Sequence, residues 1–201
     1  MRQINLHIVG TSPLLMNNVE SMRNEALSGG SVLPPPEEEA KARLYHTEDK
    51  KSLGVPGVAL HRALIKATGG FKFGKSTLSS LVVSCVHVGP KEIIPLNTLE
   101  YTLDSRSVMI KGRGRVSRVR PKIWPWGLDC ELSFDETMIP LKGFGEKLPL
   151  IIKRAGTLVG ILDFRPEKKG QFGQFRATKI ELLEAREVEP FPEPEFIWRA
   201  A

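Results

Sequence analysis

Apolar and polar residues alternate near the start of this chain. In RQINLHIVG, residues 2–10, Ile4, Leu6 and Ile8 occupy every second position. In GLDCELSFD, residues 127–135, the apolar side chains again fall at alternate positions. Both patterns predict strands with one buried face. We also predict a strand at residues 175–185, FRATKIELLEA.

Two other segments have a helical period. VPGVALHRALIKATGG, residues 55–70, places apolar residues at i, i+3, i+4 and i+7 after a proline, and it ends in Gly-Gly, as helices do. PLIIKRAGTLVG, residues 149–160, predicts a second helix. Between them, LSSLVVSCVHV at 78–88 is rich in Val and Ser and predicts a strand.

The segments between these elements are predicted to be connections. TSPLLMNN, residues 11–18, predicts a turn. A polar insertion follows at about 17–53, with one short helix expected at 37–46 because prolines precede the run and glutamates occupy its first turn. A basic ribbon at about 105–122 leads into the strand at 127–135.

The order of elements is strand, insertion, helix, strand, basic ribbon into strand, helix, glycine-rich loop and strand. This is close to β-α-β-β-α-β. We therefore predict an α+β, ferredoxin-like or RRM-like fold, in which two helices cover an antiparallel sheet elaborated by long insertions and a β-hairpin. Residues 1–187 are expected to form one domain and 188–201 a tail. Docking of the tail onto a neighbouring copy through Phe191, Phe196 and Trp198, or a disordered acidic tail, both stay open.

Charge adds a partner class to this picture. The net charge is +6 and the pI is near 9.4, which favours polyanions. Residues 105–122 hold seven Lys or Arg and no Asp or Glu, so the excess is local. The N-terminus does not have a signal-peptide pattern, and no apolar run is long enough to span a membrane, so a cytoplasmic protein is expected.

The basic ribbon is the first candidate site, because Arg binds phosphate bidentately and aromatic rings stack on bases. A regular strand would place its early and late cations on opposite faces. We expect either a bulge or turn at Val116–Ser117 or a loop around Gly112 and Gly114. The alternatives are a solvated charged face and tryptophans that pack in the core. The candidate residues are Lys111, Arg113, Arg115, Arg118, Arg120, Lys122, Trp124 and Trp126.

A second candidate is the glycine-rich segment at 166–175. Gly170 and Gly173 permit close approach of the backbone to a ligand. A hairpin turn whose phenylalanines pack inward is the alternative. The candidate ligand-binding residues here are Lys168, Lys169, Gln171, Phe172 and Gln174.

The segment GGFKFGKST, residues 69–77, matches the phosphate-loop pattern G-x-x-x-x-G-K-[ST]. A phosphate loop needs a strand before it and a helix after it, whereas here a helix is predicted before it and a strand after it. An ATPase in which Asp163 holds Mg²⁺ is therefore a minority hypothesis. We expect Lys72 and Lys75 to contact the phosphates of a nucleic acid instead.

Cysteine and histidine spacings predict neither a metal site nor a cofactor. Cys85 and Cys130 are expected to be buried free thiols. His7, His46, His61 and His87 are scattered without a metal-ligand spacing.

Four segments carry a resemblance to known proteins: LHIVGTSPLLMNN, VPGVALHRALIKAT, RVRPKIWPWGLDCELSF and AGTLVGILDFRPEKKGQFGQFRATKIE. They resemble a family of phage and prophage proteins, and the overall plan is similar to that of the RAMP superfamily, which includes backbone subunits of CRISPR effectors. The resemblance implies a non-enzymatic subunit that oligomerises head to tail along single-stranded DNA or RNA in a bacterial host cell. Its context would be phage replication or recombination, or a CRISPR-like ribonucleoprotein.

The resemblance also implies where the strand is bound. The sheet face and hairpin loops would contact it, with phosphates held by Arg113, Arg115, Arg118, Arg120, Lys168 and Lys169. A RAMP-like endoribonuclease is the alternative, with His46 or His61 as general base and Tyr45 or a lysine assisting.

Overall fold

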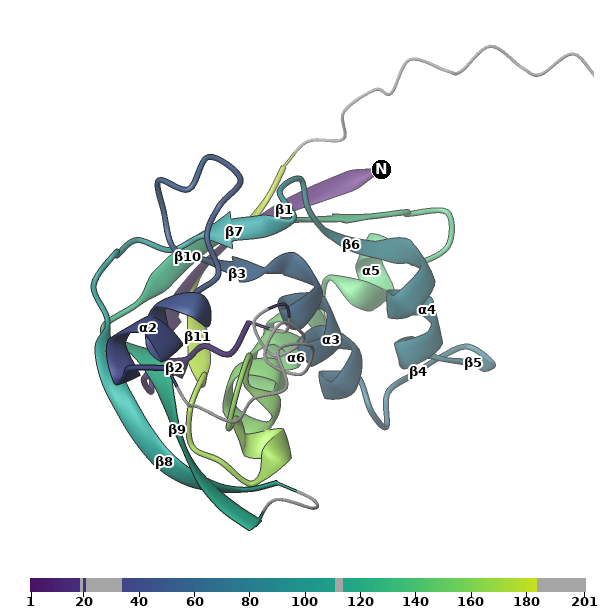
Figure 1. The fold of residues 1–201 in the computed structure, drawn as a ribbon. Helices are drawn as coiled ribbons and strands as arrows, with labels where there is room; N and C mark the ends of the chain where they lie inside the picture. Colours follow the sequence, from purple (N-terminus) through teal and green to yellow (C-terminus); the bar gives the residue numbers. More distant parts are fainter. Residues whose placement is uncertain (19, 21–33, 111–113, 184–201) are drawn as a thin grey trace, which may run out of the picture.

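The computed structural model describes residues 1–18, 20, 34–110 and 114–183. Its centre is a four-stranded antiparallel sheet in the order β11-β1-β10-β6 (Figure 1). The strands are β1 (Arg2–Gly10), β6 (Val86–Gly89), β10 (Gly127–Phe134) and β11 (Phe175–Leu182). The three strands predicted from residues 2–10, 127–135 and 175–185 are therefore confirmed.

The connections between these strands define a ferredoxin-like fold. Helix α3 (Gly57–Ala67) precedes β6, whereas α6 (Leu148–Arg154), extended by the π-helical turn η1 (Ala155–Val159), connects β10 to β11. The first and last strands of this β-α-β-β-α-β series are neighbours in the sheet. The predicted α+β fold and both predicted helices are confirmed.

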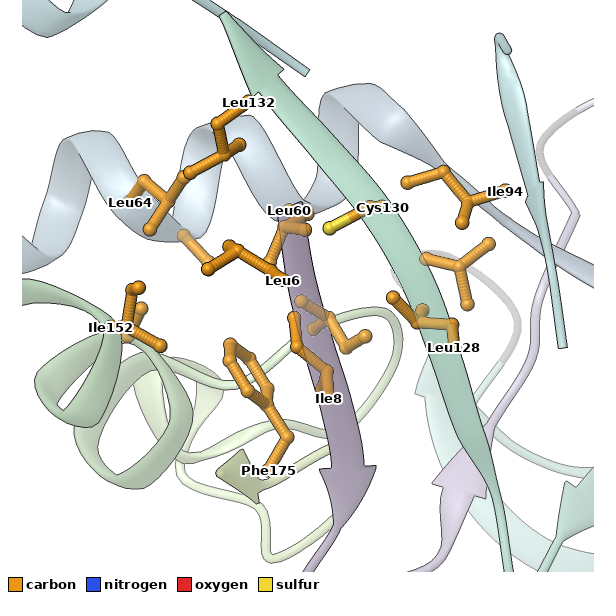
Figure 2. Packing of buried hydrophobic residues seen from close by; sticks show 14 of the residues in the cluster. Leu6, Ile8, Leu60, Leu64, Ile94, Leu128, Cys130, Leu132, Ile152 and Phe175 are labelled. Atoms are coloured by element: carbon orange, nitrogen blue, oxygen red, sulfur yellow. The ribbon is translucent and has the colours of Figure 1, made fainter. Parts of the chain in front are cut away.

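The two helices cover one face of the sheet. Alternate side chains of β1, namely Ile4, Leu6 and Ile8, are at most 2% exposed, and burial of each contributes about 1.5–3 kcal/mol. Figure 2 shows Leu6 and Ile8 packed among side chains of the neighbouring strands and helices. The labelled neighbours are Leu128, Cys130, Leu132, Leu60, Leu64, Ile94, Ile152 and Phe175.

A long hairpin extends from this core. Strands β8 (Thr102–Ile110) and β9 (Gly114–Ile123) pair along their whole length and form a curved arm at one side of the molecule (Figure 1). Val116 and Ser117 pair in regular register with Val108 and Ser107, so the bulge or turn considered there is wrong. A ten-residue strand such as β9 spans about 30 Å.

The segment TSPLLMNN is not only a turn. Leu14 and Leu15 form the short strand β2, which pairs with Ile123 and Lys122 at the base of the arm. Leu14, Leu15 and Met16 are fully buried. The segment therefore fastens the arm to the core.

The strand predicted at 78–88 is wrong in its first part. Residues Leu78–Cys85 form helix α4, and only the end of the segment is strand β6. Thr77 caps the helix by accepting a hydrogen bond from the amide of Ser80. Buried Leu78, Val82 and Cys85 lie on one face, a helical period that outweighs the strand preference of Val.

Shorter elements complete the fold. The expected helix at 37–46 is confirmed in shortened form as α2 (Pro36–Ala42), which packs on β9. The remaining elements are β3 (Gly54–Pro56), β7 (Ile93–Pro95), β4 (Lys72–Phe73), β5 (Ser76–Thr77), α5 (Leu141–Phe144) and the 3₁₀ turn η2 (Pro166–Lys168).

Candidate nucleic-acid interface

The β8–β9 arm has two chemically different faces. Residues at even positions share one face, and several of them make ion pairs or ring contacts with α2 and the segment 160–174. At odd positions Ser105, Ser107 and Ser117 are exposed, as is Arg115. The register therefore places Arg115 on the opposite face from Arg118 and Arg120, as expected for a regular strand without a bulge.

Arg118 and Arg120 lie against carboxylates of the same chain. The side chains are 15% and 12% exposed, respectively; Arg118 lies 3.5 Å from Glu39 and Arg120 lies 3.1 Å from Asp163. The negative charge of the carboxylate partly cancels the field of the guanidinium, so the paired arginine attracts a phosphate less strongly. We therefore assign both arginines to anchoring the arm, whereas Arg115 keeps its exposed position. Lys111 and Arg113 lie outside the described residues.

Lys122 and the two tryptophans lie at the base of the arm. Trp126 is 2% exposed and donates its indole N–H to the carbonyl of Ser12 at 2.8 Å, so it is a core residue that bases cannot reach. Trp124 is 52% exposed and keeps a ring face available for stacking. Lys122 is half-buried and pairs with Leu15.

The glycine-rich segment is a tightly folded loop from Gly160 to Gln174. Leu162, Phe164 and Lys169 have positive φ angles of 59°, 50° and 61°, a conformation that non-glycine residues rarely adopt. A Cβ on Gly170 would lie 1.6 Å from the carbonyl oxygen of Phe164, so only glycine fits there. Unusual backbone of this kind tends to cluster at functional sites.

The loop is held by the segment that contains β2. The amide of Gly173 donates to the carbonyl of Pro13 at 2.8 Å, and the amide of Asp163 donates to that of Leu15 at 3.1 Å. The amide of Gln174 donates to Ser12 Oγ at 3.0 Å. The SPLL motif and the glycine-rich motif are therefore two halves of one structural unit.

The loop divides its candidate residues between surface and interior. Lys168, Lys169 and Gln171 are exposed, whereas Phe172 is buried. Gln174 is half-buried and donates its side-chain amide to the carbonyl of Thr157 at 3.0 Å. The two lysines and Gln171 are accessible to a ligand. Phe172 packs inward, as in the alternative considered for this segment.

Arg106 joins the arm to this loop. Its guanidinium lies 4.7 Å from the ring centre of Phe172 and 5.4 Å from that of Phe164, within the range of cation–π attraction. Hydrogen bonds to Asp104 raise the pKa of this guanidinium above its usual value. The arm and the glycine-rich loop therefore form one connected surface, a link that the sequence analysis missed.

The phosphate-loop motif forms a β-hairpin. Helix α3 leads into it as predicted, and Lys72 and Phe73 then pair with Thr77 and Ser76. A helix follows it, contrary to our prediction, but the strand that a phosphate loop requires before it is missing. Asp163, the Mg²⁺ candidate, is ion-paired with Arg120. The geometry does not favour an ATPase, and it leaves Lys72 and Lys75 exposed on the hairpin.

The open face of the central sheet is not a stacking surface. Its outward side chains include no Phe, Tyr or Trp; they are Gln3, Asn5, His7, Val9, His87, Asp129, Glu131, Ser133, Arg176, Lys179 and Glu181. Stacking on a sheet face uses aromatic rings, and the three carboxylates here offset the two cations, Arg176 and Lys179. The sheet face is therefore a weaker candidate for phosphate binding than the arm and the glycine-rich loop.

A cavity of about 640 Å³ lies on this open face. It contains a hydrogen bond between His7 Nδ1 and the Asp129 carboxylate. Cys130 also lines it, but burial, aided by the charge of Asp129, raises the pKa of this thiol from 9.0 to about 12. The sequence analysis proposed neither His7 nor Asp129 as a site residue, because the two are distant in the chain.

The structure also places His61 and His46, the two histidines considered as general bases. His61 Nε2 lies 3.2 Å from the carbonyl of Val82. His46 is exposed and forms an isolated β-bridge with Leu53. In the described ranges, no three His, Cys, Asp or Glu side chains converge as metal ligands. None of the helices in the described part of the chain is long and apolar enough to span a bilayer.

Comparison with known proteins places the fold. No protein-family model matches the chain, and no curated protein matches its sequence. The chain is similar to one solved in the cryo-EM structure of the type III-B Cmr-beta complex bound to cognate target RNA, with a TM-score of 0.52 and 13% identity. The match covers 91% of this chain but only 61% of that one. At this identity the likeness shows the fold alone, which is α+β and ferredoxin-like.

Proposed function

We propose that this protein binds a single strand of nucleic acid, without catalysing a reaction, and that copies assemble along the strand. The observation that carries the proposal is the contact of Arg106 with Phe164 and Phe172. It joins the arm to the glycine-rich loop, on which Lys168 and Lys169 stay exposed, while Arg115 is exposed on the other face of the arm. These exposed cations are suited to a phosphate backbone.

The fold supports the class of partner. The structural neighbour belongs to a complex with target RNA, so RNA is our first choice of strand, within a CRISPR-like ribonucleoprotein or a phage replication or recombination complex. Single-stranded DNA is the second choice, because stacking and phosphate contacts do not distinguish the sugars. Trp124, exposed at the base of the arm, adds a ring for stacking.

Fluorescence anisotropy with labelled single-stranded RNA, single-stranded DNA and duplex, at two salt concentrations, tests the proposal. We expect K168A/K169A to reduce the salt slope of single-strand binding by about 1.4, or 0.7 for each lost phosphate contact. The control is K50A/K51A, two exposed lysines in the turn after His46. Absence of binding to any of the three at low salt would overturn the proposal.

The His7–Asp129 pair favours metal-independent RNA cleavage as a second candidate function. With Nδ1 bonded to the carboxylate, Nε2 of His7 is left to accept a proton from a ribose 2′-hydroxyl. Cleavage of single-stranded RNA by the wild type that disappears in His7→Ala, with binding retained, is the expected result. Intact RNA after prolonged incubation with the wild type rejects this candidate.

A further inference from the structure

The β4–β5 hairpin is the centre of a second basic surface. Between Gly57 and Cys85 the chain carries Arg62, Lys66, Lys72 and Lys75 but no Asp or Glu. Gly74, between the two hairpin strands, has φ +58° and open space around it. Lys72 and Lys75 are exposed, so the hairpin presents its charges directly to solvent.

Helix α6 and the residue before it bring two further cations against this hairpin and the segment that leads into it. Lys147 Nζ donates to the carbonyl of Lys72 at 3.3 Å. Arg154 donates to the carbonyl of Gly69 at 3.4 Å, and its guanidinium lies 4.6 Å from the ring centre of Phe71. Because all three contacts are to neutral groups, they gather positive charge without neutralising it.

Few carboxylates balance this charge. Lys72 and Lys75 form no ion pair within the described ranges. Glu167 is already held by Arg165 at 2.8 Å and by Lys66 at 3.6 Å. Like charges held together raise the local potential and favour an anionic partner.

The second basic surface is connected to the surface formed by the arm and the glycine-rich loop. The Lys66–Glu167 contact links α3 to the turn that carries Lys168 and Lys169. In Figure 1 the β4–β5 hairpin and the β8–β9 arm lie at opposite sides of the molecule, with α3 and α6 between them. A strand that leaves the arm at the glycine-rich loop therefore meets further cations along the helical side.

We propose that the β4–β5 hairpin, with Lys72 and Lys75, clamps the phosphates of the same single strand after it leaves the glycine-rich loop. This inference rests on the proposed function and extends its footprint across the helical side. It gives the phosphate-loop-like motif a role without nucleotide hydrolysis: the hairpin binds backbone phosphates as point charges.

The test compares K72E/K75E with the control K50E/K51E in anisotropy titrations of a labelled 30-nucleotide single-stranded RNA. We expect the first variant to weaken binding roughly tenfold at low salt and to reduce the salt slope by about 1.4, while the control changes neither. Urea unfolding checks that both variants keep wild-type stability, as expected for exposed side chains.

The outcomes separate the two proposals. If wild type binds and K168A/K169A weakens binding, but K72E/K75E does not, the hairpin clamp is wrong and the proposed function stands. If wild type binds no nucleic acid, the proposed function fails first. Binding of ATP that is lost in K72E/K75E, with RNA binding unchanged, would also overturn the clamp and return the motif to a nucleotide site.

Discussion

Gly173 is a position at which conformation and space both exclude a side chain. Its φ is +65°, and a Cβ would lie 1.9 Å from the carbonyl oxygen of Ile161. We expect Gly173→Ala to lower the free energy of unfolding by about 3 kcal/mol, since strain and overpacking add. Gly74→Ala is the matched control, with φ +58° but nothing nearby, and about 1 kcal/mol is expected. Equal losses of stability in urea titrations would contradict the close packing of the loop.

Cys130 should show its raised pKa in both reactivity and stability. With the thiol pKa at about 12 instead of 9.0, native Cys130 stays protonated and should resist iodoacetamide at pH 8.5, whereas the unfolded chain reacts. Because the folded pKa is the higher one, the stabilisation is complete below pH 9 and is lost as pH rises toward 12. The pH dependence of urea unfolding for wild type and Cys130→Ala measures this; identical curves above pH 9 would argue against it.

At the scale of single residues, the sequence shows the type of a side chain but not its distant partners. Lys168, Lys169 and Arg115 are exposed, and their side-chain types alone made them candidates. Arg118 and Arg120 have the same chemistry, but their partners Glu39 and Asp163 are distant in the chain, so local pattern could not show that they anchor the arm. For the tryptophans, W-P-W spacing gave no sign that Trp126 packs over Gly10.

At the scale of elements, the arm depends on an ion pair at its base. Replacing Asp163 by Asn keeps the oxygen that accepts from the Phe164 amide but leaves Arg120, 12% exposed, without its counter-charge. We expect a loss of about 1–3 kcal/mol and faster hydrogen exchange in β8 and β9 than in wild type. Glu181→Gln, in an exposed pair with Lys179, is the control and should cost under about 0.5 kcal/mol. Unchanged exchange in β9 would show that the pair does not hold the arm.

Elements were predictable where one face is buried in a regular period. In β1, β10 and α3 the apolar residues repeat at the period that places them on one face, and that face packs on the core. Helix α4 was missed because its Val and Ser residues favour strands locally, whereas packing of Leu78, Val82 and Cys85 decides its conformation. Strand β2 was missed because two paired residues are too few to produce a period.

At the scale of the molecule, the faces differ in charge. The open sheet face carries Asp129, Glu131 and Glu181 beside Arg176 and Lys179, whereas the exposed lysines of the glycine-rich loop and the β4–β5 hairpin lie elsewhere. If the proposed function is right, we expect a polyanion on the side of the loop and hairpin and not on the sheet face that RRM proteins use. The topology itself followed from the order of predicted elements; which face binds could not, since it depends on pairing between distant strands.

Assembly along a strand is the prediction that belongs to the whole molecule. If copies bind side by side, the number of protomers per strand should rise in steps as single-stranded RNA is lengthened from 10 to 60 nucleotides, measured by mass photometry or native mass spectrometry. Head-to-tail contact is heterologous and open, so the series should not stop at two. The variant K168A/K169A should need more protein to reach the same steps, because phosphate contacts supply the affinity. A single bound copy on every length would show that the protein binds as an isolated subunit.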